Sequence, residues 1–173
     1  MIGGVVNSPI DSYELDDMEN RSLAASGRYW DVTQLEEGSL AVLVTFDDGS
    51  QDVITLKRDL QPASASDVEF VSAARRDVDR LVAAVRSNEA LAIEELDEIE
   101  RRCQGASPGP WRPFLEGDGG VGGTSVIWVS DSDDEPDLYL WLGGDLAPDA
   151  DYEFTAAARQ DVPRLLAALG RNV

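Results

Sequence analysis

The chain carries few side chains of the types that perform catalysis. It has no histidine, so the residue that most often serves as general base or metal ligand is absent. Its one cysteine, Cys103, therefore has no imidazole to activate it. Glu116 and Asp118 form the only local carboxylate pair that we consider for acid–base chemistry. Because carboxylates are abundant in this chain, such pairs arise by chance, and we expect a protein that acts by binding.

Two further patterns could hold an ion or a phosphate. The segment 131–137 is dense in carboxylates, which hard cations such as Ca²⁺ prefer. A calcium-binding EF-hand loop beginning at Asp131 needs glycine and glutamate where this chain has Pro136 and Leu142. The glycine-rich segment 117–123 lacks the Lys-Ser/Thr ending of a phosphate-binding loop. We therefore predict no metal and no cofactor, and a loop that could border a site near Glu116 and Asp118.

Two Arg-x-Asp motifs recur, at 75–77 and at 159–161. An arginine near an acidic helix forms a bidentate ion pair that fixes helix packing. We predict this structural role against two acidic helices, whose carboxylates are Asp16, Glu19, Asp97 and Glu100. The alternative is that Arg75 and Arg159 contact a ligand, so both remain candidate binding residues.

The four tryptophans divide into two pairs. Trp30 and Trp111 follow similar predicted helices, a position typical of core residues whose indole N–H donates to a carbonyl. Trp128 and Trp141 lie on two predicted strands that face each other. One of this second pair could be exposed and anchor a partner, so both are candidate binding residues.

These motifs lie within an internal repeat. The segment 67–85 returns as 151–169, and the segment 15–30 returns as 96–111. The chain therefore reads as two copies of one unit, residues 1–87 and residues 88–173. Any site has to be considered against that symmetry.

Hydrophobic periodicity and turn residues predict the elements of each unit. The apolar spacing over 67–86 and 149–170 is typical of amphipathic helices, and shorter helices are expected at 12–25 and 89–104. Asp-Gly between the β-rich runs 40–46 and 51–57 indicates a hairpin, and a second hairpin is expected from 124–130 and 138–142. Asn88 suits the N-cap of the third helix. Pro163 predicts a kink or break near Asp161 in the last helix.

The expected fold class is α+β, a tandem duplication of an α-β-β-β-α unit. Because one such unit is marginal as an independent fold, we expect the two copies to pack with pseudo-twofold symmetry around a shared core. A continuous, mostly antiparallel sheet of about six strands with the helices on one face meets this requirement. Two small sheets packed through helices are the alternative.

The charge balance limits the partners. The chain has 34 acidic and 14 basic residues, a net charge of −20, which repels nucleic-acid backbones and anionic membranes. A single cysteine, no signal sequence and no membrane-spanning apolar run indicate a cytoplasmic protein. The acidity fits a basic protein partner, a decoy that mimics DNA, or simply solubility in a saline cytoplasm. The oligomeric state is left open.

Two stretches of the second unit resemble a known family. The run Ser107-Pro-Gly-Pro-Trp and the tail Phe154-Thr-Ala-Ala-Ala-Arg-Gln-Asp-Val-Pro-Arg-Leu-Leu resemble a widespread family of uncharacterised bacterial and phage proteins, and related tails occur in Ead-like phage early proteins. The resemblance implies no established chemistry. In relatives we expect an Arg-Asp-His continuation after the Glu-Gly found here at 116–117, where this chain has Asp118-Gly-Gly instead. The family context favours defence or toxin-immunity roles.

These observations favour an acidic, non-enzymatic binding protein, similar to an immunity protein or inhibitor, with a basic macromolecular partner. The alternative is a small-molecule binder or weak enzyme with a pocket between the two repeats. That pocket would be lined by residues of both units, such as Arg75, Arg159 and Trp128.

Overall fold

The computed structural model describes residues 9–116, 124–130 and 137–173. The expectations for Asp118, for the segment 117–123 and for the turn 131–136 lie outside these residues. The described elements, in chain order, are α1 (Ser12–Ala24), β1 (Tyr29–Gln34), β2 (Leu40–Thr45), β3 (Gln51–Arg58), β4 (Gln61–Pro62), α2 (Ala65–Ser87), α3 (Ile93–Gly105), β5 (Arg112–Phe114), β6 (Val126–Trp128), β7 (Leu138–Leu142), β8 (Asp145–Leu146) and α4 (Asp149–Ala168).

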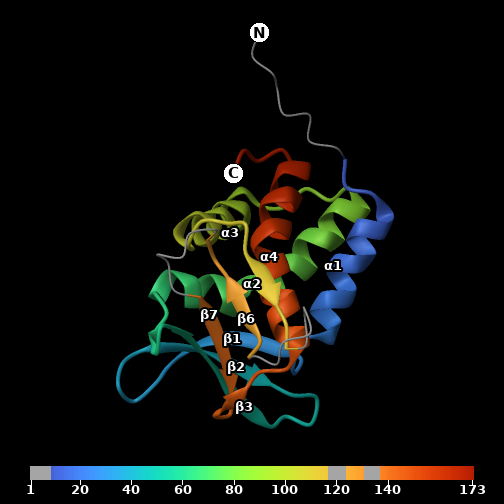
Figure 1. Cartoon of the computed structure of the whole chain (residues 1–173). Helices are drawn as coiled ribbons and strands as arrows, with labels where there is room; N and C mark the ends of the chain where they lie inside the picture. Colours follow the sequence, from blue (N-terminus) through green and yellow to red (C-terminus); the bar gives the residue numbers. More distant parts are fainter. Residues whose placement is uncertain (1–8, 117–123, 131–136) are drawn as a thin grey trace.

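All described strands belong to one antiparallel sheet (Figure 1). Its order is β1-β2-β3-β7-β6-β5, with β4 beside β3 and β8 beside β7. The two halves of the chain meet where β3 pairs with β7, in a register that places Ile54 opposite Leu142 and Arg58 opposite Leu138. The predictions of an α+β fold and a mostly antiparallel sheet are confirmed, and the sheet is continuous rather than divided in two.

Alternation along the strands defines the face that the helices cover. Successive strand residues point to opposite faces, and on β2 and β3 every second residue is buried in the core, as Val42, Val44, Ile54 and Leu56 are. Helices α2 and α4 turn their apolar stripes to this face, and Phe70, Leu81, Phe154 and Leu165 are all at most 2% exposed. The helices thus lie against one face of the sheet (Figure 1).

Aromatic pairs join the two halves within this core. Trp30 meets Phe154 edge to face, with ring centroids 5.5 Å apart. Phe70 meets Trp111 in the same way at 5.9 Å. Each of these two pairs combines one residue from either half, so these four rings are packed only when the halves meet.

Two buried aspartates make a second matched pair of contacts between the halves. Asp67 accepts hydrogen bonds from the backbone N–H and the hydroxyl of Ser107, at 2.7 and 2.8 Å. Asp151 accepts from the backbone N–H of Ser26 at 2.6 Å. Each aspartate, in the first turns of α2 or α4, therefore holds the turn that follows the short helix of the other half.

An N-cap expected at Asn88 and a break expected near Asp161 are both not found. Asn88 does not begin the third helix; it ends α2 in the left-handed conformation, with φ of 52° and its N–H bonded to the carbonyls of Ala84 and Val85. Asparagine suits both positions, and α3 begins only at Ile93. Helix α4 continues through Pro163 without a break, and Asp161 accepts a hydrogen bond from Arg21 instead of capping a new helix.

Candidate functional site

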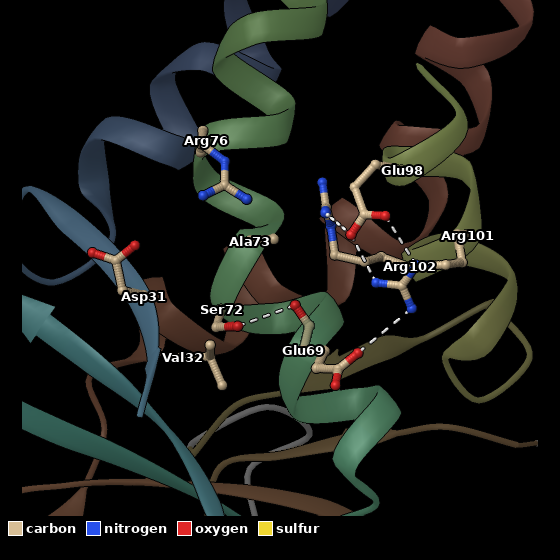
Figure 2. Close-up of a pocket in the computed structure, with 9 residues that line it drawn as sticks. All are labelled: Asp31, Val32, Glu69, Ser72, Ala73, Arg76, Glu98, Arg101 and Arg102. Carbon is tan, nitrogen blue, oxygen red and sulfur yellow. Dashed lines mark hydrogen bonds and ion pairs between the residues drawn. The ribbon is translucent and has the colours of Figure 1, made fainter. Parts of the chain in front are cut away.

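Three adjoining hollows follow the outer face of α2, and we name them together the α2 groove. Their volumes are about 510, 240 and 210 Å³, and Arg76 lines all three. Figure 2 shows α2 as the floor, with β1 along one side and α3 along the other. Because β1 and α2 come from the first half and α3 from the second, the groove lies where the halves meet.

The helical repeat of α2 determines which side chains reach the groove. Positions three or four residues apart share a face of a helix. The apolar stripe of α2 faces the sheet, and the opposite face presents Glu69, Ala73, Arg76 and Arg80 to the groove. Ser64 caps the start of the helix by accepting from the N–H of Asp67 at 3.1 Å.

Six arginines line the groove, and three of them are bound to carboxylates. Arg102 forms a bidentate pair with Asp77, with contacts of 2.9 to 3.1 Å. Arg101 donates to Glu98 at 2.8 and 3.0 Å, and this hydrogen bond is the main cause that lowers the pKa of Glu98 to about 2. Figure 2 shows these arginines on α3 beside Glu98. The Arg102–Asp77 pair holds α3 against α2, and the Arg101–Glu98 pair lies within α3.

Arg80 is the third of these bound arginines. It donates to Glu95 at 3.0 Å and to Glu89 at 3.1 and 3.3 Å. Its hydrogen bonds with these two carboxylates raise its pKa above the ordinary value. Arg80 thus ties the middle of α2 to α3 and to the chain that precedes α3.

The other three arginines line the largest hollow and have no such carboxylate partner. Among the described residues, none of Arg28, Arg75 and Arg76 donates a hydrogen bond to a carboxylate. Arg28 lies over the ring of Tyr29. The side chain of Arg76 is 61% exposed and forms a long ion pair with Asp77, at 3.7 Å, which Asp77 shares with its bidentate partner Arg102. The residues that line this hollow include four arginines and two aspartates. It is locally cationic on a strongly acidic protein.

Arg75 is buried beneath this hollow. It is 7% exposed, and its Nη1 donates to the carbonyls of Ser26 and Gly27. Burial lowers its pKa, and the charges of nearby aspartates oppose that change. A guanidinium stays protonated throughout the physiological range, so Arg75 adds a fixed positive charge to the floor of the groove.

The edge of the sheet beside the groove has unused hydrogen-bonding groups. In an antiparallel ladder, hydrogen-bonded and non-hydrogen-bonded pairs alternate. Leu35 donates to Ser39 at 2.8 Å, so the register of β1 and β2 directs the odd-numbered residues of β1 toward β2. The N–H and C=O groups of Trp30 and Val32 therefore point outward. Among the described residues, none pairs with these outward groups.

The opposite edge of the sheet is closed at the equivalent place. The side chain of Gln160 on α4 accepts from the N–H of Trp111 at 3.1 Å and donates to its carbonyl at 2.6 Å. Position 160 corresponds to position 76 in the internal repeat. Arg76 has donors but no acceptor, so it cannot make the same pair of contacts with Trp30.

The structure places the predicted arginines as follows. Arg75 lines the α2 groove, whereas Arg159 donates to the carbonyl of Ser107 at 2.9 Å and lies over the ring of Phe70. Arg75 and Arg159 bind backbone carbonyls rather than the acidic helices, so the predicted ion pairs are wrong for these two arginines. The other two recurring arginines do pair with these helices, Arg80 with Glu95 of α3 and Arg164 with Glu14 of α1. The carboxylates named in the prediction are paired with two further arginines: Asp16 and Glu19 with Arg86, and Asp97 and Glu100 with Arg171.

The other candidate binding residues lie outside the groove. Trp128 on β6 is 44% exposed and stacks on Phe114 with centroids 5.1 Å apart. Trp141 on β7 is half-buried, with Lys57 over its ring. Glu116 is exposed, and its backbone N–H donates to Ser125 at 2.9 Å. The structure does not bring these residues together with Arg75.

The remaining expectations concern the core. The indole N–H of Trp30 donates to Ser26, as predicted, but that of Trp111 is buried without a partner among the described residues. Burial raises the pKa of the Cys103 thiol, which disfavours a nucleophilic thiolate.

Within the described ranges, no group of three or more His, Cys, Asp or Glu side chains could hold a metal ion. None of the helices described is both long and apolar enough to cross a bilayer.

Sequence reasoning missed the exposed arginines of the groove. Arg28, Arg76 and Arg101 correspond to Gly109, Gln160 and Asn20 in the repeat. By contrast, Arg75, Arg80 and Arg102 correspond to Arg159, Arg164 and Arg21. The available signal is therefore that these three arginines are not repeated, whereas the predicted candidates Arg75 and Arg159 are repeated.

Comparisons of the chain with family models, with curated proteins and with solved structures gave no match. The groove and the charges of the chain are therefore the observations that bear on its function.

Proposed function

We propose that this protein acts by binding and that the α2 groove receives an anionic ligand. The observation that carries the proposal is the set of three arginines, Arg28, Arg75 and Arg76, that lines the largest hollow without a carboxylate hydrogen-bond partner among the described residues. Guanidinium groups bind carboxylates and phosphates through parallel hydrogen bonds. The volume of about 510 Å³ is within the range of small-molecule sites.

We further infer that the chain is a tandem duplication whose halves pack with pseudo-twofold symmetry. The matched aromatic pairs and the matched aspartate contacts support this inference. So does the pairing of Arg80 with Glu95 and of Arg164 with Glu14, which are equivalent positions of the repeat. On this view the repeated Arg75 maintains the fold and adds its charge to the floor of the groove, whereas the unrepeated Arg28 and Arg76 are available for a ligand.

The test is a titration of the protein with inorganic phosphate and with citrate, followed by calorimetry and thermal unfolding. We expect Arg76→Ala to weaken binding about tenfold, because a hydrogen bond to a charged group contributes about 1.5–3 kcal/mol. Arg164→Ala is the matched control: it also removes one positive charge from an exposed helix position, but it lies outside the groove, beside Glu14. Equal effects of both variants, or no binding by the wild type, would contradict the proposal.

A second candidate is the engagement of a basic macromolecule, in the manner of an immunity protein or inhibitor. It is favoured by exposed carboxylates on α1, on α3 and in the loops between the first strands, including Asp17, Glu36, Asp47 and Glu94. Such a complex forms fast and depends strongly on salt. A pull-down at low and moderate salt, with wild type and with these four residues changed to their amides, tests it. Retention that is equal for both proteins counts against this candidate.

A further inference from the structure

We propose that the ligand of the α2 groove is an extended peptide segment that carries a carboxylate and adds as a strand to the outer edge of β1. This inference rests on the proposed function, since it names the kind of anion that the groove receives. It follows from three features: the edge of β1, the shape of the groove and the position of its arginines.

The first feature is the hydrogen-bonding edge. Trp30 and Val32 direct their N–H and C=O groups away from β2. A peptide that joins such an edge completes the ladder, and its main chain supplies much of the affinity. Unpaired edges promote pairing with other chains, and this sheet closes the equivalent position of its other edge with Gln160. In the first half, the outward N–H and C=O of Trp30 have no such partner among the described residues.

The second feature is the room beside β1. Neighbouring strands lie about 4.8 Å apart in the plane of a sheet. A strand added to β1 would therefore lie over α2, between β1 and α3. The floor there is formed by the small side chains Ser72 and Ala73 (Figure 2). Larger residues at these positions would occupy the space of the added strand.

The third feature is the charge and apolar surface along this path. Arg76 stands on the floor, with Arg101 on the α3 side and Arg28 near the start of β1. Alternate side chains of an added strand would point toward α2, so a carboxylate at one such position meets Arg76. Tyr29 and Val32 are 55% and 51% exposed and offer apolar contact to its neighbours.

The overall charge limits how acidic the segment is. A net charge of −20 repels a run of carboxylates, whereas charges farther away than about 8 Å are largely screened at physiological salt. The groove therefore selects a mostly neutral segment with an isolated carboxylate.

The experiment is a selection of random decapeptides displayed on phage against the full chain, with Arg76→Ala as counter-selection. The most enriched peptide is synthesised and titrated against two matched variants. Val32→Pro removes the outward N–H while keeping the ladder with β2, since proline is tolerated on edge strands. Val32→Thr keeps the N–H and the branched shape. We expect binding at least tenfold weaker for Val32→Pro, near wild type for Val32→Thr, and slower amide exchange at Trp30 and Val32 in the complex.

A second measurement does not depend on the folding of a variant. N-methylation of the peptide at alternate residues blocks the edge that faces β1, and N-methylation at the intervening residues leaves that edge intact. We expect only one of the two series to lose binding. Equal binding by both series, or equal binding to Val32→Pro and Val32→Thr, would overturn strand addition. Enriched peptides without Asp or Glu would overturn the carboxylate requirement.

The outcomes separate this inference from the proposed function. If phosphate and citrate bind in an Arg76-dependent manner but no peptide is enriched, the peptide inference fails and the anion site stands. If neither the small anions nor any peptide depends on Arg76, both fail.

Discussion

At the scale of single residues, two equivalent aspartates differ in how their charge is satisfied. Both oxygens of Asp67 accept hydrogen bonds from Ser107. In Asp151 only Oδ1 has a donor, the N–H of Ser26, and Oδ2 is buried without a partner among the described residues. Burial therefore raises the pKa of Asp151. The same position of the repeat thus stabilises the fold differently in the two halves.

The raised pKa of Asp151 predicts a pH dependence of stability. Because the pKa of Asp151 is raised in the folded protein, its contribution to stability is present below the unfolded pKa of about 4 and is lost as pH rises through the folded value. Asp151→Asn should therefore remove part of the fall in stability between about pH 4 and pH 7. Urea unfolding at a series of pH values measures it.

Asp67→Asn is the control for this prediction. It replaces one of the two oxygens that accept from Ser107 with an NH₂ donor, and a buried donor left without its partner costs about 1–3 kcal/mol. We expect that loss at pH 7, because the hydrogen bonds from Ser107 are made to the native side chain. If Asp151→Asn loses as much stability as Asp67→Asn at pH 7, the interpretation of the Asp151 environment is wrong.

At the scale of elements, α2 and α4 have similar sequences, but the sheet edges beside them differ in their hydrogen bonding. Gln160 on α4 closes the edge at Trp111, while α2 presents Arg76 beside the outward groups of Trp30. An arginine cannot satisfy a carbonyl and an N–H together, because it has no acceptor. One substitution in a repeated helix is thus enough to turn a closed edge into an open one.

Exchanging these residues should move stability in opposite directions. Arg76→Gln can bond the N–H and C=O of Trp30, and we expect a gain of about 0.5–1.5 kcal/mol in unfolding free energy. Gln160→Ala should lose about 1–3 kcal/mol, because two partly buried groups of Trp111 lose their partner. Chemical denaturation of both variants measures these changes. A loss of stability in Arg76→Gln would contradict the equivalence of the two edges.

The elements also show what the sequence could predict. The helices follow from periodicity and the first hairpin from its Asp-Gly turn, since these signals are local. Asn88 was assigned to the wrong helix end because asparagine suits an N-cap and a left-handed C-cap alike. Within the groove, Arg75 was a candidate, but Arg76 looked like any exposed helix arginine. Its importance depends on the orientation of the β1 edge, which no local pattern reveals.

At the scale of the whole molecule, the halves are joined through the sheet and through the core. Strands β3 and β7 pair over five residues, and each aromatic pair of the core takes one ring from either half. A half by itself would expose the surfaces that these contacts bury. We therefore predict that residues 1–89 and 90–173 do not fold separately but form a one-to-one complex when mixed.

Cutting between residues 89 and 90 suits this test, because the connection from α2 to α3 is exposed there. Circular dichroism should show little cooperative unfolding for either fragment and recovery of the intact chain's transition for the mixture. Phe70→Ala in the first fragment should weaken association by more than a hundredfold, since removing a buried phenylalanine costs about 3–5 kcal/mol and Phe70 packs on Trp111 across the junction. Leu23→Ala, at an exposed position of α1, is the matched control and should leave association unchanged. A fragment that unfolds cooperatively alone would mean that the halves are independent domains, and the groove between β1, α2 and α3 would then depend on how two domains dock.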